Sequence, residues 1–597
     1  MSKARQTVET LRTVLVDGDV TNANFTGADL EIGKGGTGAS TAGAARTALG
    51  LAIGSDVQGY DANTAKLDEA ANFTGTLQNG GSNVIVDSDI GTTVLAPNGS
   101  AANLTNLPAS GSADFVASGT LPNGKPVILN ANGTVTVVDD TTTAISQALP
   151  AASATVWQSG SINKPSISFD PNTNGKFVIV STLSSKPNVR IGNVSGTTLT
   201  YGSSVSTSQN GQWTAVAYDP FVANKFILTF NDTDNGGIKA YVCTVSGNTI
   251  SLGSIQTVRS ANASNIRICF DKVTSGKFII SFKNSSNNYA TVVSGTRVGD
   301  NLSFGSELVL NAGESLFQNL DCDPHNSGRF ATVYRDYPNS QRGTMVICNV
   351  EGSTITEGSE LVFNSGTTKD CQIAFDPNVV NKAVIAFTDL SNGNNGTCVV
   401  ATLSGTGSGA TASFSSEYVF DTGNTFSDAF FEIKFDKKTP NKFLLAYRDR
   451  DNSNKGTAVT GTISGTSISY TSKVVFFNAG IEEGNMAVNP NEYGKFVVVI
   501  MDYSNNYGQA IPLQIATSIT TTNVTASNFL GTSTAAYTNG QTAKIMLQGG
   551  ISTNQSSLAI GSTYYIQKDG TLATTADEPS IVAGKAVSAT TLLLKGI

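Results

Sequence analysis

The sequence predicts an all-β protein built around a seven-bladed β-propeller of four-stranded blades, with a fibrous Gly/Ala/Asn-rich N-terminal stem and a small C-terminal β domain. Three observations predict this fold. Only 14% of the 597 residues are charged and 60 are Gly, a composition that suits β surfaces and tight turns. A strand–turn–strand motif recurs seven times in the middle of the chain. A second hairpin motif follows most of these copies.

The repeated motif is an apolar strand, an Asp, a short turn, a basic residue six positions after the Asp, and a second apolar strand. Successive copies start 49 to 60 residues apart. The turn residues are Asp170, Asp219, Asp271, Asp323, Asp376, Asp436 and, in the last copy, Asn489. The basic residues are Lys176, Lys225, Lys277, Arg329, Lys382, Lys442 and Lys495.

The second half of each copy reads as a hairpin with Gly at its turn, as in Val194-Ser195-Gly196. One copy therefore holds four strands in about 50 residues, which is the size of a propeller blade. A β-solenoid is the competing interpretation, but its repeats are usually shorter. The seventh copy stops after three strands, and we expect residues 154–160 to supply its missing outer strand.

Five copies carry another Asp seven residues after the basic position, at the start of the loop between the second and third strands. On a propeller these loops emerge on one face, and they are rich in Asn, Asp and Tyr. Carboxylates, amides and Tyr rings are groups that bind sugars. We therefore predict a receptor-binding rim that binds a surface glycan; the alternative, that each Asp only starts a turn, stays open. The candidate residues are Asp232, Asp336, Asp389, Asp449 and Asp502.

The sequence offers little for catalysis, metal binding or cofactor binding. The single His, His325, is expected in an exposed turn, so His-based triads and His-rich metal sites are unsupported. Residues 170–175 resemble the opening of a calcium loop, but position twelve is Ser181 instead of Glu, so a turn-capping Asp is expected. We expect no catalytic residue, no metal and no cofactor. Glycosidase chemistry, which needs only two carboxylates, stays open.

Charge and cysteine content narrow the function further. The net charge is −8 with no basic stripe, which argues against nucleic-acid binding. The six Cys lie between Cys243 and Cys398, several inside apolar strands, and are expected to be buried reduced thiols and not disulfides. The N-terminus lacks an apolar signal core, so we expect synthesis in a cytoplasm without a signal peptide.

The composition divides the chain into five parts. We expect an N-terminal segment at 1–18, a fibrous stem at 19–125, a connector at 126–150, the propeller at 151–515 and a C-terminal β domain at 516–597. The stem is too poor in apolar residues to bury a core alone. Intertwining with identical chains would stabilise it, which predicts an oligomer.

Several runs resemble segments of tail fibre proteins of tailed bacteriophages, including those of marine phages. They are I-G-K-G-G-T-G-A-S-T-A-G-A-A-R-T-A-L-G-L at 32–51, A-P-N-G-S-A-A-N-L-T-N-L-P at 96–108 and L-P-N-G-K-P-V-I-L-N-A-N-G-T-V-T-V-V at 121–138. The C-terminal runs A-Y-T-N-G-Q-T-A and G-S-T-Y-Y-I-Q-K-D-G-T-L are similar to a small β domain at the ends of such fibres.

The resemblance implies a homotrimer in the phage virion that mediates host recognition and adsorption. Its N-terminus would bind the tail or an adaptor protein, and its distal domains would meet a glycan or another receptor of the host cell. The resemblance implies no catalytic residues. Three alternatives stay open: a purely structural head or baseplate fibre, a glycan-cleaving fibre, and a bacterial surface adhesin.

Overall fold

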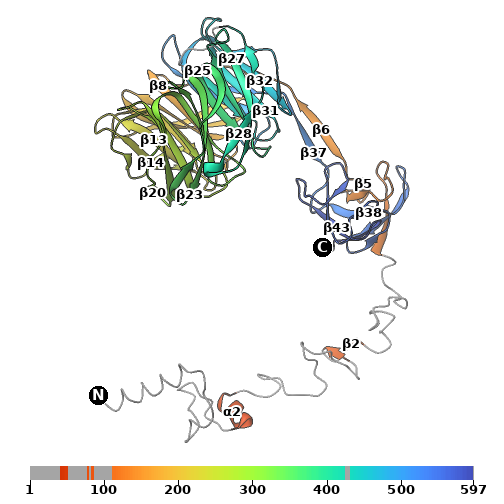
Figure 1. Ribbon diagram of the computed structural model, residues 1–597. Helices are drawn as coiled ribbons and strands as arrows, with labels where there is room; N and C mark the ends of the chain where they lie inside the picture. Colours follow the sequence, from red (N-terminus) through yellow and green to blue (C-terminus); the bar gives the residue numbers. More distant parts are fainter. Residues whose placement is uncertain (1–40, 51–76, 80–81, 86–110, 424–429, 596–597) are drawn as a thin grey trace, which may run out of the picture. The chain divides into compact units, whose positions relative to one another are not determined.

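The computed structural model describes residues 41–50, 77–79, 82–85, 111–423 and 430–595. The chain divides into two compact units, the first made of Met1–Thr136, Leu530–Tyr564 and Val582–Ile597, the second of Val137–Phe529 and Tyr565–Ile581. The expected attachment segment 1–18, most of the stem and the fibre-like run at 96–108 lie outside the described residues. Within the stem, the structure describes helix α2 (Ala42–Ala48) and the hairpin of β1 (Leu77–Asn79) and β2 (Ser82–Ile85) (Figure 1).

The second unit contains the predicted propeller, and the all-β fold class is confirmed (Figure 1). Each blade is an antiparallel sheet whose strands follow one another from the inside outwards. The innermost strands of neighbouring blades contact one another around the ring. These inner strands are β8 (Ile162–Phe169), β12 (Gly211–Tyr218), β17 (Ala263–Phe270), β21 (Leu308–Cys322), β25 (Leu361–Phe375), β30 (Phe431–Phe435) and β34 (Val474–Val488).

The second and third strands of each blade hold the apolar core. The second strands are β9 (Lys176–Leu183), β13 (Lys225–Asp232), β18 (Lys277–Asn284), β22 (Arg329–Asp336), β26 (Lys382–Asp389), β31 (Lys442–Asp449) and β35 (Lys495–Asp502). The third strands are β10 (Lys186–Ser195), β14 (Ile238–Ser246), β19 (Tyr289–Val298), β23 (Arg342–Glu351), β27 (Asn395–Ser404), β32 (Lys455–Ser464) and β36 (Gly508–Gln514). The two sets pair in register along most of their lengths.

The outer strands are shorter and less regular. They are β11 (Thr198–Ser206), β15 (Thr249–Leu252), β16 (Gln256–Arg259), β20 (Asn301–Phe304), β24 (Thr354–Glu357), β28 (Thr411–Phe414), β29 (Tyr418–Asp421) and β33 (Ser467–Tyr470). Three strands of 15 residues, β21, β25 and β34, each belong to two blades. The first part of each pairs with the third strand of one blade (β19, β23 or β32), and the second part forms the inner strand of the next blade. These strands join neighbouring blades directly.

The seventh blade closes the ring as the sequence predicts. Its outer strand is β7 (Thr155–Gln158), which comes from the chain before the first blade and pairs antiparallel with β36. Trp157 of β7 is 1% exposed and packs with Phe177 of blade one and Val497 of blade seven. The first and last blades therefore share a strand and a core cluster.

A buried apolar cluster lies at each contact between successive blades. Among the described residues there are seven such clusters, one for each interface, including the one between blades seven and one. The Phe that follows the basic residue of the repeat recurs in them, as in Phe226 and Phe496, both fully buried. A closed ring of seven blades leaves no open sheet edge between the first and last blades.

Both chain connections of the propeller leave together. Strand β6 (Asp140–Ile145) pairs with β37 (Thr517–Thr522) as a two-stranded ribbon (Figure 1). The ribbon begins beside the turn that precedes β35, where the N–H of Ile515 donates to the carbonyl of Gly494 at 2.9 Å. The opposite face of the propeller carries no such connection.

The small β domain is not made from residues 516–597 alone, as the sequence suggested. Strand β3 (Ser112–Val116), expected in the stem, pairs in register with β39 (Thr542–Leu547). One sheet has the order β3-β39-β38-β4-β5, with β38 (Phe529–Ser533), β4 (Pro126–Leu129) and β5 (Val135–Val137). The other has the order β40-β44-β43-β41-β42: β40 (Ile551–Ser552), β44 (Thr591–Leu594), β43 (Val582–Ser588), β41 (Thr563–Ile566) and β42 (Leu572–Ala573). Composition does not reveal a pairing across more than 400 residues.

Candidate functional site on the loop face

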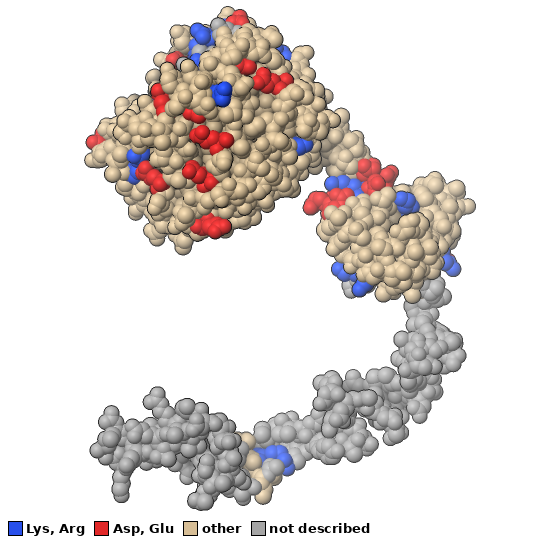
Figure 2. Space-filling view, in the orientation of Figure 1, with Lys and Arg blue, Asp and Glu red and all other residues tan. Residues whose placement is uncertain are grey.

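The propeller has two faces with different chemistry. We call the face with the loops between second and third strands the loop face, and the face with the repeated Asp turns the turn face. The first residue of an inner strand lies opposite the last residue of the second strand, as in the pairs Gly211–Asp232 and Ala263–Asn284. The loops and the beginnings of the inner strands therefore share one face. In the view of Figure 2, acidic and basic side chains are scattered over the propeller without a continuous basic patch.

The five Asp of the predicted receptor-binding rim are buried in the structure. All five candidate Asp lie on the loop face, but their exposed fractions are only 0% to 5%, because each caps its own loop. Asp232 accepts the N–H of Asp234 at 2.9 Å, and Asp389 accepts that of Ser391 at 2.9 Å. The corresponding backbone hydrogen bonds form at Asp336, Asp449 and Asp502. These five residues shape the loops and do not face solvent.

The same loops expose aromatic rings instead. Tyr337 is 48% exposed, Tyr503 61% and Tyr507 36%. The loop that holds Tyr503 and Tyr507 lies next to blade one, since the N–H of Ile162 donates to the carbonyl of Asn506 at 3.1 Å. Exposed aromatic rings provide apolar faces for stacking beside polar loop groups. The sequence analysis included Tyr among the sugar-binding groups but named only the Asp as candidates.

A bulge begins the inner strand of five blades and turns one side chain toward the channel at the centre of the ring. The register between inner and second strands shifts at this point in each case. The residue at the bulge has φ between 51° and 57°, a left-handed conformation that is unfavourable for bulky side chains. The bulge residues are Lys164, Trp213, Asn265, Phe317 and Asp370. Sequence reasoning missed them, because the bulge shows no Gly.

These five bulge residues line one cavity at the channel mouth, which we call the loop-face cavity. Its volume is about 400 Å³. Polar side chains from the other inner strands complete its wall, and they are Arg267, Gln318, Gln372, Glu432, Glu483 and Asn485. Every blade contributes to the cavity, so its shape depends on the closed ring.

An ion pair and a cation–π contact fix Trp213 at the mouth of the channel. The Lys164 ammonium pairs with Glu483, which is 9% exposed, and lies 4.8 Å from the centroid of the Trp213 ring. The hydroxyl of Thr214 donates to the carbonyl of Lys164 at 2.9 Å, which links blades one and two. The Trp213 ring is therefore held by its neighbours and is half-buried instead of free. An ordered ring loses little conformational entropy when a ligand stacks on it.

A groove extends from this mouth between blades one and two. Its volume is about 530 Å³, and it shares Lys164 and Trp213 with the loop-face cavity. The rest of its wall comes from residues 160–163, 182–185 and 211–212 and from Thr233, and it combines polar side chains with the apolar Ile162 and Leu183. Trp213 lines both the cavity and the groove, and the loop of blade seven that exposes Tyr503 and Tyr507 adjoins Ile162 in the wall of the groove.

The turn face confirms the expected turn-capping Asp. In all seven blades the turn residue accepts the N–H two positions ahead, for example Asp170 from Asn172 at 2.9 Å. The repeated Lys has a role that the sequence did not suggest. Lys277 donates to the carbonyl of Gly352 in the next blade at 2.6 Å, and Lys495 donates across the ring closure to Gly196 at 2.8 Å. These positions therefore bind blade to blade.

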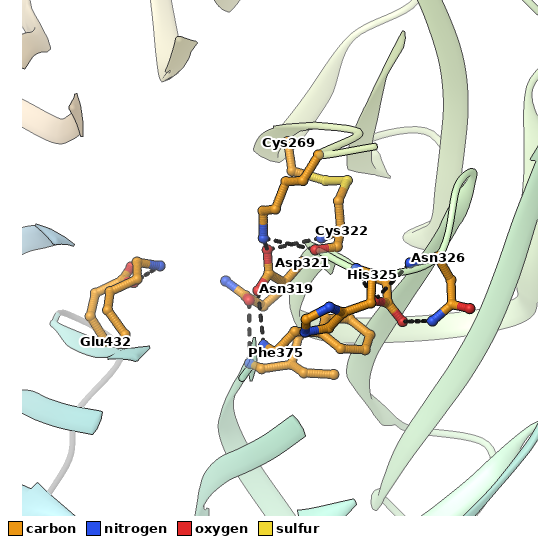
Figure 3. Close-up of polar contacts among 12 residues, drawn as sticks. Cys269, Asn319, Asp321, Cys322, His325, Asn326, Phe375 and Glu432 are labelled. Carbon is orange, nitrogen blue, oxygen red and sulfur yellow. Dashed lines mark hydrogen bonds and ion pairs between the residues drawn. A yellow bond between two sulfur atoms is a disulfide. The ribbon is translucent and has the colours of Figure 1, made fainter. Parts of the chain in front are cut away.

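The cysteine prediction holds for four residues and is wrong for two. Cys243, Cys348, Cys371 and Cys398 are free and buried, and burial raises the pKa of each thiol. Cys269 and Cys322 form a disulfide between the turn-face ends of strands β17 and β21 (Figure 3). The pairing joins blades three and four, and sequence spacing alone does not reveal that the two strand ends are neighbours.

The remaining observations concern His325, groups of potential metal ligands and possible membrane-spanning helices. His325 is half-buried in the turn of blade four instead of exposed. Within the described ranges no group of three or more His, Cys, Asp or Glu side chains has the arrangement of a metal site. None of the helices described is long and apolar enough to cross a membrane.

The chain was also compared with known proteins. No family model and no curated protein matches the chain. The solved structures similar to it include the BP39L lectin from Burkholderia pseudomallei, with 9% identity, 60% of this chain and 97% of that chain covered, and a TM-score of 0.46. The WD40 domain of Toxoplasma gondii coronin has 8% identity, 67% and 89% coverage, and a TM-score of 0.41. The NanB sialidase from Streptococcus pneumoniae has 12% identity, 60% and 70% coverage, and a TM-score of 0.35.

Proposed function

We propose that this chain is a fibre protein of a tailed phage, and that the loop face of its propeller binds a glycan of the host surface. The observation that carries the binding proposal is the half-buried Trp213 in a groove between blades one and two, with the exposed Tyr503 and Tyr507 on the adjoining loop of blade seven. Sugar rings have apolar faces that stack on aromatic side chains and hydroxyls that bond to polar groups. The fibre-like runs of the sequence support the assignment to a phage particle.

The connections of the propeller support the choice of face. The β6–β37 ribbon leaves beside the turn face, so the rest of the chain attaches on that side. In this proposal the fibre is a homotrimer, and its N-terminal part attaches to the phage tail or to an adaptor protein. Three linked weak sites would gain roughly 10²–10⁴ in apparent affinity over one.

Binding to a panel of purified bacterial surface polysaccharides and to intact host cells tests the proposal on the full-length protein. We expect Trp213→Ala and the double change Tyr503→Ala/Tyr507→Ala to weaken binding roughly tenfold or more, as central aromatic residues do in other interfaces. Tyr337→Ala is the matched control, because it removes an equally exposed ring from the same face on blade four. We expect it to change binding less than about twofold.

Two results would overturn the binding proposal. One is an unaltered affinity of Trp213→Ala while its thermal unfolding matches that of the unchanged protein. The other is the absence of saturable binding to every polysaccharide and cell type, which would leave a purely structural head or baseplate fibre. Sedimentation of the full-length protein tests the trimer separately.

A glycan-cleaving fibre is the second candidate, because Asp370, Glu432 and Glu483 line the same cavity. We favour binding without cleavage, since Glu483 is paired with Lys164, and Glu432 accepts a hydrogen bond from Asn485 at 2.9 Å. Release of reducing sugar ends from a bound polysaccharide, lost in Glu432→Gln, would reverse this preference. We expect no release.

A further inference from the structure

The turn face has a departure from the repeat that the proposed function does not use. The residue after the turn Asp or Asn is Pro in five of the seven blades and Lys in blades three and six. Pro presets the backbone for this position of the turn. The two Lys give up that benefit while the turn keeps its Asp cap, as the 2.7 Å bond from Val273 to Asp271 shows. The two residues are Lys272 and Lys437.

Both Lys line one cavity at the turn-face end of the channel, which we call the turn-face cavity. Its volume is about 320 Å³. Aromatic rings that precede the turn residues form part of its wall, for example Phe375 and Phe435, each 2% exposed. A third lysine, Lys434, also lines it. A cavity with buried apolar walls strengthens electrostatic interactions relative to open solvent.

The three lysines differ in their partners. Lys272 pairs with Asp321 at 2.8 Å and also donates to the carbonyl of Cys322 at 2.7 Å. Lys434 pairs with Glu432 at 3.0 Å. Figure 3 shows Asp321 near the centre of the view and Glu432 apart from it at the left, each with its own contacts. Lys437 forms no hydrogen bond or ion pair with any residue in the described part of the chain.

The charges of the cavity do not balance. Four basic and two acidic side chains line it, an excess of two positive charges in a chain whose net charge is −8. These charged residues are Arg267, Lys272, Lys434, Lys437, Asp321 and Glu432. Asp376, in the neighbouring blade five, also attracts the ammonium of Lys437 electrostatically. Uncompensated positive charge beside apolar walls is unfavourable unless an anion joins it.

The protonation of Lys437 reflects the same imbalance. Burial, followed by repulsion from Lys272, lowers the pKa of Lys437 to about 7 despite the attraction of Asp321. For Asp321, burial opposes ionisation, but the attraction of Lys272 and Lys437 prevails and lowers its pKa. The ammonium of Lys437 is thus the group whose charge a bound anion would stabilise most.

We propose that the turn-face cavity is a binding site for a small oxyanion, a carboxylate or a sulfate, and that Lys437 is its cationic ligand. Lys272 and Lys434, each already held by one carboxylate, add positive potential from two other sides. The anion comes either from free sulfate or from the carboxylate of an acidic sugar. The turn-face cavity adjoins the loop-face cavity, since residues such as Arg267 and Glu432 line both. Of these two cavities, the three lysines line only the turn-face cavity and Trp213 lines only the loop-face cavity, so the anion proposal does not rest on glycan binding.

Calorimetric titration of the full-length protein with sodium sulfate and with sodium glucuronate, at pH 6 and constant ionic strength, tests the site. We expect saturable binding of at least one anion and a loss of roughly tenfold or more in Lys437→Gln. Lys438→Gln is the matched control, because it removes the same charge from the next, exposed residue. We expect it to change affinity less than about twofold. Tighter binding of glucuronate identifies the sugar acid as the source of the anion, and tighter binding of sulfate identifies the free ion.

The dependence on pH provides a second measurement. Because the free Lys437 loses its proton near pH 7, anion affinity should fall as the pH rises from 6 to 9, by up to about tenfold per pH unit. Lys437→Gln should lack this dependence. Equal loss in Lys437→Gln and Lys438→Gln, or no saturable binding of either anion at pH 6, would overturn the proposal. Trp213→Ala should bind the anion normally, so failure here is distinguishable from failure of the glycan site.

Discussion

The two mouths of the propeller channel are built from the same seven repeats and yet differ in what they offer to a ligand. At the loop face, bulges in the inner strands present Trp213 beside Lys164, which already pairs with Glu483, and Phe317 beside Lys369. At the turn face, buried Asp caps and blade-to-blade Lys contacts are regular, and the exceptions are two lysines in place of Pro. The difference teaches that repeated polar residues hold this ring together, while departures from the repeat carry the chemistry.

The largest expected effect comes from opening the ring, on which both mouths depend. An added Cβ at Gly508 would lie 2.4 Å from an atom of the Trp157 ring, so Gly508→Val should displace β7 from blade seven. We expect the free energy of unfolding to fall by about 3 kcal/mol, measured by urea denaturation. Gly409→Ala, where an added Cβ meets nothing within 4 Å, is the control and should stay within about 0.5 kcal/mol. An unchanged Gly508→Val would mean that the strand from the N-terminal side does not close the propeller.

The disulfide should act on the turn face more than on the loop face. Cys269 and Cys322 are 53 residues apart in sequence and join two inner strands at the turn-face cavity. Cys269→Ser/Cys322→Ser should lower the free energy of unfolding by roughly 2–4 kcal/mol, because the unfolded chain loses a constraint. Thermal unfolding with and without reductant checks this, and the double variant should no longer respond to reductant. A larger loss of glycan binding than of sulfate or glucuronate binding would contradict the assignment of the two mouths.

Asp449 and Trp213 should separate stability from binding on the loop face. Asp449 is fully buried, accepts the N–H of Asn452 at 3.2 Å and pairs with Lys473 at 3.1 Å. Asp449→Ala should cost roughly 1–3 kcal/mol of stability and leave glycan affinity nearly unchanged, because the carboxylate does not face the ligand. Trp213→Ala should do the reverse. Urea denaturation and glycan titration of both variants measure the two roles separately. Loss of affinity in Asp449→Ala alone would support the predicted carboxylate rim as the ligand surface.

The smallest expected effect is a pH-dependent gain in the stability of the variant Lys437→Gln. The pKa of Lys437 is about 7 in the folded protein and 10.5 ordinarily, so the unfolded chain binds more protons between these values. Stability of the unchanged protein should therefore rise with pH across that window, and below about pH 7 the full cost of the charge is present. In buffer without sulfate, Lys437→Gln should be more stable by about 1 kcal/mol at pH 6, with the difference narrowing toward pH 10. Stability curves of Lys437→Gln and Lys438→Gln that run parallel would show that Lys437 carries no special cost.

The propeller could be predicted almost completely because its signals are local. Each turn Asp bonds to a backbone N–H two residues away, and each hairpin turn uses a nearby Gly, so both leave a pattern that recurs at a fixed spacing. Even ring closure was predictable, since a copy with three strands requires a fourth from elsewhere. The five rim Asp were placed on the correct face, but their orientation was not, because the same residue type caps a loop or meets a ligand.

The sequence by itself determined the seven blades, the capped turns and the shared face of the loops, since these depend on residues within one repeat. Only the tertiary structure decided which groups meet across repeats. It brought Trp213 to Lys164, Lys437 to the cavity of Lys272, Cys269 to Cys322, and β3 to β39. The physical reason is that residues 49 to more than 400 positions apart become neighbours only when the blades close or the small domain assembles, and no local pattern records such a contact.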